Sequence, residues 1–220
     1  MALFPWHKID TVLLDMDGTL LDLHFDNQFW LEHVPLKLSE KNDKSLEQCR
    51  KEMHDSTNKV KGQIEWYCLD YWSEQLDLDV MEAKREIDHL ISLRPDTLPF
   101  LDALRASGKK VVLVTNAHPD SLSLKVEKTQ LDEHIDELIS THQFGVTKES
   151  QILWKRLQDY LQFDPAKTLF VDDSQVILDA AKEYGIAYTL GITNPDSKKP
   201  ENILHGHAIT NDYMCLLADI

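Results

Sequence analysis

Long apolar runs are absent from this 220-residue sequence, in which nothing approaches the ~18 apolar residues of a membrane-spanning helix. The first apolar run, Val12–Leu14, is short and is followed at once by acidic residues, which is not typical of a signal peptide. Cysteine is scarce as well. The three cysteines are odd in number and share no close spacing, which argues against a disulfide framework and against a zinc motif. These absences predict a cytoplasmic protein that is not anchored in a membrane.

Basic residues are outnumbered, with 23 Lys and Arg against 38 Asp and Glu and a formal net charge of -15. Such a charge repels phosphate polymers and anionic surfaces, so we expect neither a nucleic-acid partner nor a membrane partner. A small anionic substrate would need a local positive element, such as a metal ion, to receive it. The length and the 42% hydrophobic content fit one domain, or one domain with a large insertion, that buries a sizeable core.

Glycine is nearly missing between residues 22 and 93, where Gly62 is the only one. Apolar residues recur there at spacings of three and four, and Ser45 with Gln48 resembles a helix-start capping pair. The spacing predicts four helices, near residues 26–39, 45–60, 63–76 and 80–93. We therefore expect a helical cap domain at residues 22–93, inserted into a core domain made of residues 1–21 and 94–220.

Outside this insertion, the pattern alternates between strand and helix. Short apolar runs predict strands at 12–14, 110–115, 137–140, 168–171 and 187–191. Helices are predicted between them, over about 96–106, 119–129, 149–161 and 174–184. This alternation is typical of a parallel sheet covered by helices on both faces. The expected fold class is α/β, a three-layer Rossmann-like parallel sheet, followed after Asn194 by a polar tail with one short helix near 211–217.

Three of the predicted strands end in polar residues that a buried strand does not need, and a lysine precedes one of the helices. These residues are Asp15 and Asp17, Thr115 and Asn116, Asp172 and Asp173, and Lys148. In a doubly wound sheet, the chemistry lies at the carboxyl ends of the strands. Four carboxylates at one edge would repel one another unless a hard cation binds between them. Mg²⁺, held by carboxylates, waters and a substrate phosphate, fits this pattern best.

In order and spacing, the same residues resemble the four motifs of the haloacid dehalogenase (HAD) superfamily, beginning with Asp15-Met16-Asp17-Gly18-Thr19. The helical insertion resembles the type 1 cap of that superfamily, and the resemblance covers nearly the whole chain. It implies a Mg²⁺-dependent phosphomonoesterase that works through an aspartyl-phosphate intermediate. Members that remove halogens lack the second acid, so the presence of Asp17 favours hydrolysis of phosphate esters.

The resemblance also implies three catalytic residues. Asp15 resembles the nucleophile that attacks phosphorus. Asp17 resembles the general acid that protonates the leaving oxygen and then, as a base, activates water. Lys148 would offset the charge of the nucleophile and of the phosphoryl group, and so counts as a phosphate-binding residue as well.

For the remaining positions, the resemblance implies binding roles. Thr115 and the Asn116 amide resemble the phosphate clamp. Asp172 and Asp173 would complete a metal site with Asp15 and with the main-chain carbonyl of Asp17. Many relatives carry a further acid four residues after the position of Asp173, where this chain has Ile177. This chain therefore resembles the variant in which two adjacent acids, Asp172 and Asp173, complete the metal site. By alignment we expect Asp173 to contact the metal and Asp172 to support it.

Three further stretches, Trp66–Gln75, Thr141–Lys148 and Thr193–Ser197, resemble members of this superfamily that hydrolyse the purine nucleoside monophosphates GMP and IMP. The aromatic residues near Trp66 have two interpretations: cap core at helical spacing, or a stacking surface for a purine base. We interpret His118 and His142 as solvated or helix-start residues.

Several alternatives remain open from the sequence. A sugar-phosphate or phosphoglycolate-type phosphatase and a phosphomutase would use the same motifs. From another class, a response-regulator receiver also combines an acidic pair with a threonine and a lysine, but it is shorter and has no cap. We expect a monomer or a weak homo-oligomer.

Overall fold

Six parallel strands form the centre of the protein, in a computed structural model that describes residues 3–220. The strands are β1 (Thr11–Leu14), β2 (Lys110–Thr115), β3 (Glu137–Ser140), β4 (Thr168–Asp172), β5 (Tyr188–Ile192) and β6 (Ala208–Thr210). Their order in the sheet is β3-β2-β1-β4-β5-β6, and every neighbouring pair is parallel. The predicted α/β fold with a parallel sheet is confirmed.

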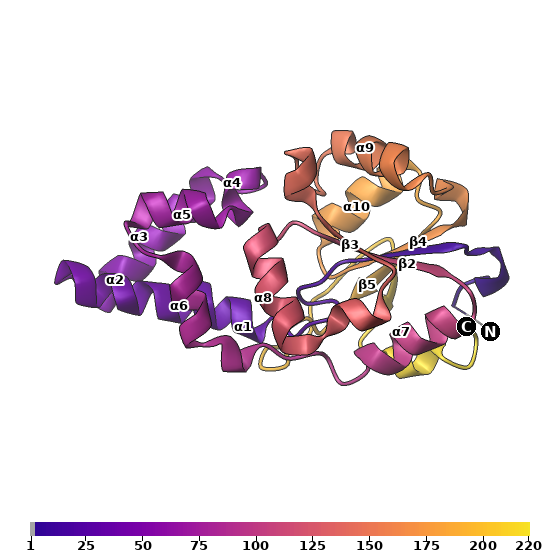
Figure 1. Cartoon of the computed structure of the whole chain (residues 1–220), viewed down its shortest axis with the longest axis horizontal. Helices are drawn as coiled ribbons and strands as arrows, with labels where there is room; N and C mark the ends of the chain where they lie inside the picture. The colour runs from indigo at the N-terminus through magenta and orange to yellow at the C-terminus, as the bar shows by residue number, and fades with distance from the viewer. Residues whose placement is uncertain (1–2) are drawn as a thin grey trace.

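Helices cover both faces of the sheet (Figure 1). They are α7 (Thr97–Ala106), α8 (Pro119–Thr129), α9 (Gln151–Leu161) and α10 (Gln175–Tyr184). Val12 and Leu14 pack in one buried cluster with residues of α7, whereas Leu13 packs in another with residues of α9 and α10. Successive side chains of a strand point to opposite faces, so an uninterrupted apolar strand supplies both clusters. This is the expected three-layer arrangement.

Shorter turns of helix link these elements. They are η1 (Trp6–Lys8), η4 (Leu131–His134), η5 (Thr141–Phe144), η6 (Pro165–Lys167) and η7 (Tyr213–Leu216). The last of these confirms the short helix predicted in the tail. The tail also contributes β6, which the sequence pattern did not predict, because this edge strand has three residues of which only Thr210 is buried.

The residues inserted after β1 form the cap, which extends from one end of the sheet (Figure 1). Its elements are α1 (His24–Gln28), η2 (Phe29–His33), α2 (Val34–Asn42), α3 (Leu46–Lys59), α4 (Ile64–Tyr67), α5 (Leu69–Leu76), α6 (Val80–Glu86) and η3 (Asp88–Leu90). Phe29, Met53 and Trp72 belong to a separate buried core within it. The predicted capping pair is confirmed, since Ser45 and Gln48 bond reciprocally at the start of α3.

Two of the four predicted cap helices differ from the structure. The helix predicted over 80–93 ends at Glu86, and the separate short turn η3 follows it. The periodicity predicts a single helix over 63–76, but Cys68 is extended, with φ -81 and ψ 113, and separates α4 from α5. The carbonyl of Trp66 instead accepts a hydrogen bond of 2.9 Å from the indole of Trp72. The break turns Cys68 away from the helical path and toward the core domain.

The chain enters and leaves the cap through two adjacent segments. Leu21 pairs with Leu93 in an antiparallel bridge, and the Asp22 amide donates to the carbonyl of Ser92 over 3.0 Å. The predicted domain boundaries, after residues 21 and 93, fall within this paired linker and remain a prediction. None of the helices described between residues 3 and 220 has the length and apolar character that a membrane span requires.

Candidate active site

Asp15 and Asp172 lie side by side because their strands are neighbours. The parallel register of β1 and β4 pairs Leu14 with Val171, and the Asp15 amide donates to the Val171 carbonyl over 2.9 Å. Carboxylate oxygens of Asp15, Asp172 and Asp173 all lie within 4.8 Å of one another. The structure therefore brings together three of the four acids that the sequence singles out, at the predicted edge of the sheet.

Lys148 reaches this carboxylate cluster from the loop that precedes α9. Its Nζ pairs with Asp15 Oδ1 and lies 2.7 Å from Asp172 Oδ2, and the whole side chain is buried. Burial alone would lower the pKa of Lys148, but the two carboxylates outweigh it and raise that pKa well above the usual range. Lys148 is therefore a fixed positive charge at neutral pH.

The carboxylate cluster carries more negative charge than one lysine balances. Burial raises the pKa of Asp15 to about 6, against the opposing effect of Lys148. Burial, followed by the charges of Asp172 and Asp15, raises the pKa of Asp173 well above its ordinary value. No lysine or arginine between residues 3 and 220 forms an ion pair with Asp173. An oxygen-only donor set with excess negative charge suits a hard divalent cation, so these residues fit Mg²⁺.

The two adjacent acids of β4 have different surroundings. One oxygen of Asp172 accepts from Lys148, and the other accepts from the Ser174 amide over 2.8 Å. Asp173 has no side-chain partner in the part of the chain that the structure describes, although both acids line the cavity between the core domain and the cap. This difference favours Asp173 as the direct metal ligand, with Asp172 fixed behind it.

Asp17 occupies a different position from the other acids. Its carboxylate is not part of the carboxylate cluster, and its Oδ1 lies 2.7 Å from Nζ of Lys125, on α8. Burial raises the pKa of Asp17 to about 6, with Lys125 opposing this shift and Asp26 adding to it. A carboxyl group with a pKa near neutrality can both donate and accept a proton at working pH.

A series of ion pairs, in which the lysines are buried and the carboxylates part-buried, links Asp17 to the cap. Lys125 also contacts Asp26 of α1 over 2.6 Å, and Asp26 contacts Lys84 of α6 over 3.1 Å. Burial would raise the pKa of Asp26, but the two lysines lower it to about 2. The sequence analysis did not predict these ion pairs. Lys125 is buried on the same side of α8 as Ser121 and Leu124, and only the structure shows that this side meets Asp26 of the cap.

Thr115 and Asn116 end β2 at the same edge. The Thr115 hydroxyl accepts from the Ala117 amide over 3.0 Å, and Thr115 lines the cavity. Oδ1 of Asn116 accepts from the Thr141 hydroxyl over 3.0 Å and from the Lys148 amide over 2.9 Å. The Asn116 side chain thus holds the loop that carries Lys148.

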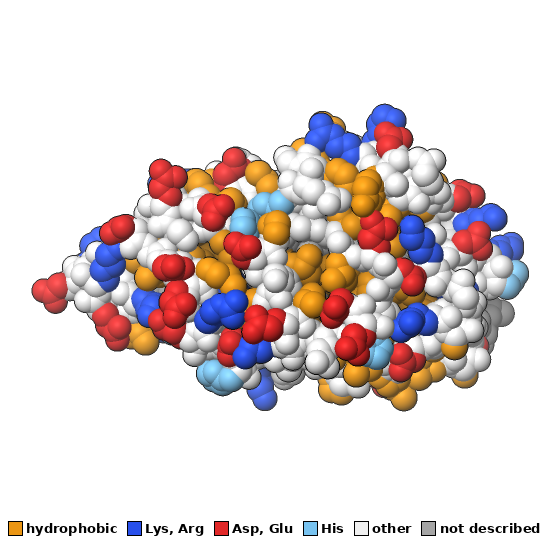
Figure 2. Space-filling view, viewed as in Figure 1, with side chains coloured by type: hydrophobic (Ala, Val, Ile, Leu, Met, Phe, Trp, Pro, Cys, Tyr) orange, Lys and Arg blue, Asp and Glu red, His pale blue; other side chains and the backbone are white. Residues whose placement is uncertain are grey.

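A cavity of about 810 Å³ lies between the core domain and the cap. Asp15, Asp17 and Lys148 line it from the core, and Trp30 and Trp66 line it from the cap. The core therefore supplies catalytic-type charged groups, while the cap supplies aromatic rings together with charged side chains such as Arg50 and Lys84, a mixture that suits a phosphate ester with a large planar group. On the face shown in Figure 2, acidic side chains are scattered over both the cap and the core, with basic and apolar side chains between them.

The two aromatic residues at the end of α4 have different contacts. Trp66 packs against the cap core and also lines the cavity, so both interpretations of this stretch fit its position. The Tyr67 hydroxyl donates to Glu149 over 3.3 Å, and Glu149 also accepts from Asn116 over 3.1 Å. Tyr67 thus connects the cap to the loop of Lys148.

Comparison with known proteins agrees with this geometry. The sequence model of the haloacid dehalogenase-like hydrolase family matches residues 9–185. GMP/IMP nucleotidase YrfG of Escherichia coli K12 is 49% identical over 215 residues, covering 98% of this chain and 97% of that protein, as is its Shigella flexneri counterpart. A HAD phosphatase from Thermococcus onnurineus shares the fold, with a TM-score of 0.78 and 24% identity over 96% of this chain and 97% of that chain. The chain belongs to the haloacid dehalogenase-like hydrolases.

Proposed function

We propose that this protein is a Mg²⁺-dependent phosphomonoesterase that hydrolyses purine nucleoside 5′-monophosphates, with GMP and IMP as the substrates. The observation that carries this proposal is the position of Asp17, a second, part-buried acid that lines the cavity with Asp15 and has a pKa near 6. The similarity to a GMP/IMP nucleotidase over nearly the full length supports the choice of substrate. That similarity gives no support to the receiver alternative.

The reaction follows from the two acids of the first motif. A carboxylate oxygen of Asp15 attacks phosphorus, the bond to the nucleoside oxygen breaks, and Asp17 donates its proton to that oxygen. Asp17 then takes a proton from a water molecule as the water attacks the aspartyl phosphate. Inorganic phosphate leaves, and both carboxyl groups return to their starting states.

The other site residues bind and orient the phosphate. Lys148, fixed between Asp15 and Asp172, offers its ammonium group to a phosphoryl oxygen. Thr115 and the Asn116 amide bind further phosphoryl oxygens. Asp15, Asp173 and the main-chain carbonyl of Asp17 would hold Mg²⁺, which when bound neutralises charge between the phosphate and the nucleophile.

A phosphate-release screen tests this function. GMP and IMP should be hydrolysed with higher kcat/KM than pyrimidine monophosphates, sugar phosphates or phosphoglycolate. EDTA should abolish release and added Mg²⁺ should restore it, because phosphate and Asp15 repel each other without a cation. A preference for a sugar phosphate would replace the substrate part of the proposal, and conversion to an isomeric phosphate would indicate a phosphomutase. Full turnover without metal would contradict the metal site.

The cap aromatics provide a test of base recognition. Stacking of a base on an aromatic ring is worth roughly 1–3 kcal/mol, so Trp66→Ala should raise KM for GMP about ten-fold or more. KM for a small sugar phosphate should change much less. Tyr160→Ala, on an exposed ring outside the cavity, serves as the control. Equal increases for both substrates would assign Trp66 to the cap core alone.

A cytoplasmic location and a monomeric or weakly associated state complete the proposal. Sedimentation of the purified protein at two concentrations would test the second of these.

A further inference from the structure

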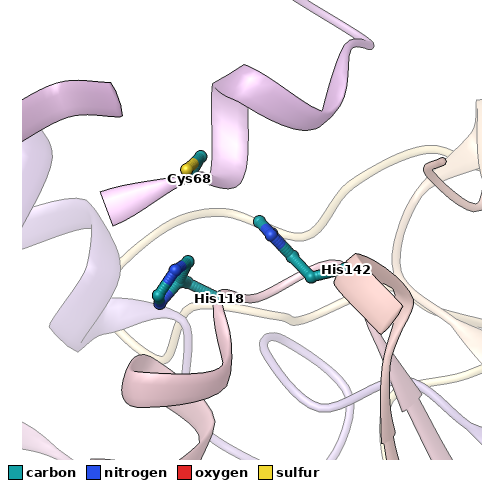
Figure 3. Close-up of side chains that lie close together, drawn as sticks. All are labelled: Cys68, His118 and His142. Carbon is teal, nitrogen blue, oxygen red and sulfur yellow. The ribbon is translucent and has the colours of Figure 1, made fainter. Parts of the chain in front are cut away.

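Three residues with metal-binding side chains meet where the cap faces the core (Figure 3). Cys68 lies at the break between α4 and α5, His118 is the residue before α8, and His142 lies in η5. One ligand atom from each of them lies within 4.8 Å of the other two. In Figure 3, the two imidazole rings come from the core and Cys68 comes from the cap above them. We call these three residues the Cys-His cluster.

One ring nitrogen of His142 is available to a ligand. Its Nε2 is buried and has no hydrogen-bond partner among residues 3–220. An unpaired buried nitrogen is costly, and such atoms are uncommon in native proteins. Burial, together with the neighbouring His118, lowers the pKa of His142. The ring is therefore held in its neutral form, which is the form that binds metals.

His118 also leaves one nitrogen free for a ligand. Its Nδ1 accepts from the Asp120 amide over 3.3 Å at the start of α8, so Nε2 is the free atom. Its side chain is 12% exposed, so the interpretation of His118 as a solvated residue is wrong, whereas the helix-start interpretation is confirmed. The two rings lie 5.1 Å apart and nearly perpendicular, at 79°. Because they are not stacked, their free nitrogens can point to a common centre.

We propose that the Cys-His cluster is a second metal site, which binds Zn²⁺ or a similar borderline-soft divalent cation. A thiolate and two imidazoles are the ligands that zinc prefers, whereas Mg²⁺ prefers the oxygen-only carboxylate cluster. In a tetrahedral zinc site, neighbouring ligand atoms lie about 3.5 Å apart, so small side-chain rotations suffice to close the site. The carboxylate of Asp70, 3.7 Å from His118 Nε2, or a water molecule fills the fourth position.

Binding of the metal moves two protons. The Cys68 thiol loses its proton to solvent and binds as the thiolate. The His118 proton moves from Nε2 to Nδ1, where the carboxylate of Asp120, 3.7 Å away, can accept a hydrogen bond from it. The long hydrogen bond from the Asp120 amide is lost in exchange. Metal affinity should therefore fall as the pH is lowered.

The site joins the two domains, because Cys68 belongs to the cap and both histidines belong to the core. A ligand that binds only when the three side chains are together stabilises the closed arrangement. Zn²⁺ should therefore slow the entry of substrate and the release of product. This consequence for turnover rests on the proposed function, whereas metal binding itself does not.

Cobalt spectroscopy tests the binding directly. Co²⁺ replaces Zn²⁺ in such sites, and a thiolate ligand gives an intense near-ultraviolet charge-transfer band that carboxylate ligands cannot give. With excess Mg²⁺ present to fill the carboxylate cluster, the wild-type protein should show this band and Zn²⁺ should remove it. Cys68→Ala should abolish the band, and His142→Ala should weaken Co²⁺ binding at least ten-fold. Cys215→Ala removes an exposed cysteine elsewhere and should leave the band unchanged.

Two spectroscopic results would overturn the proposal. One is the absence of a thiolate band in the wild-type protein, and the other is a band that survives Cys68→Ala. Circular dichroism of each variant confirms that it is folded, which is expected because Cys68 lies outside the buried cap core. Neither result depends on the activity of the enzyme.

Inhibition measurements test the effect on the cap. With p-nitrophenyl phosphate and excess Mg²⁺, Zn²⁺ should inhibit the wild-type protein at least ten-fold more strongly than Cys68→Ala. The two proteins should have equal rates without Zn²⁺. Equal inhibition of the wild-type protein and Cys68→Ala would mean that zinc acts at the carboxylate cluster, which would overturn the proposed effect on the cap. The cobalt spectra would still decide whether the Cys-His cluster binds metal.

Discussion

Asp15→Asn is expected to abolish phosphatase activity, with a loss on the order of the 10⁶-fold seen when covalent nucleophiles are removed elsewhere. An amide is a poor nucleophile, and the substitution also removes one charge from the carboxylate cluster. Release of inorganic phosphate from GMP, followed over hours at high enzyme concentration, measures the loss. The substitution is nearly isosteric, so Asp15→Asn should remain folded.

A surface substitution provides the control for this experiment. Asp10 lies one residue before β1 and is exposed, paired only with Lys167 at the surface over 3.2 Å. Asp10→Asn should retain full activity. If Asp15→Asn also kept near-normal turnover, water rather than Asp15 would attack phosphorus, and the covalent mechanism would be wrong.

Asp17→Asn is expected to lower turnover by about 10²–10⁴-fold, the usual size of general acid–base catalysis. Its carboxylate lies outside the carboxylate cluster, so the metal site should survive the change. With p-nitrophenyl phosphate, whose leaving group needs little protonation, the first step should continue while hydrolysis stalls. Phosphate should then accumulate on Asp15, and rapid quench followed by mass spectrometry should find the added mass on the peptide that contains it.

The partner of Asp17 allows a matched comparison. Lys125→Met keeps the carboxyl group of Asp17 and removes the ammonium group of Lys125, whose positive charge lowers the pKa of Asp17. The pKa of Asp17 should then rise above 6, so the alkaline limb of the kcat/KM profile, where Asp17 loses the proton that it donates, should move to higher pH. A profile unchanged by Lys125→Met, or an Asp17→Asn protein that accumulates no phosphoenzyme, would contradict the assignment of Asp17 as the proton shuttle.

The sequence predicts the carboxylate cluster well because its geometry depends on few rules. Asp15 and Asp172 follow strands that are short, apolar and parallel, and parallel strands bring their carboxyl ends to one edge. Lys148 is expected at this site from its resemblance to the lysine of the superfamily's motifs, since a place before a helix does not by itself fix where a lysine side chain reaches. The strand order that makes β1 and β4 neighbours comes from the structure.

Contacts between the cap and the core could not be predicted in this way. The ion pairs of Lys125 with Asp26, and the approach of Cys68 to His118, depend on how two separately folded units face each other. The spacing of apolar residues within one segment carries no information about that orientation. The break at Cys68 is a related case, because a tertiary hydrogen bond from Trp72 replaces a helical one there. The buried side chain of Lys125 and the free ring nitrogens of His118 and His142 therefore could not be recognised from a local sequence pattern.

The paired linker at Leu21 and Leu93 can act as the hinge of the cap. Both chain segments that join the cap to the core lie side by side, so the cap opens by rotating about them. The displacement of a cap residue then grows with its distance from these segments. Asp26 follows the linker closely and should move little, whereas Tyr67 ends α4, which lies far from α1 in Figure 1, and should move further. The contacts that opening must stretch most are then the 3.3 Å hydrogen bond from Tyr67 to Glu149 and the 3.1 Å hydrogen bond from the Thr147 hydroxyl to the Gly62 carbonyl. Each such bond contributes only about 0.5–1.5 kcal/mol, so this side of the cap is held less firmly than the side of Asp26, where two lysines bind one carboxylate.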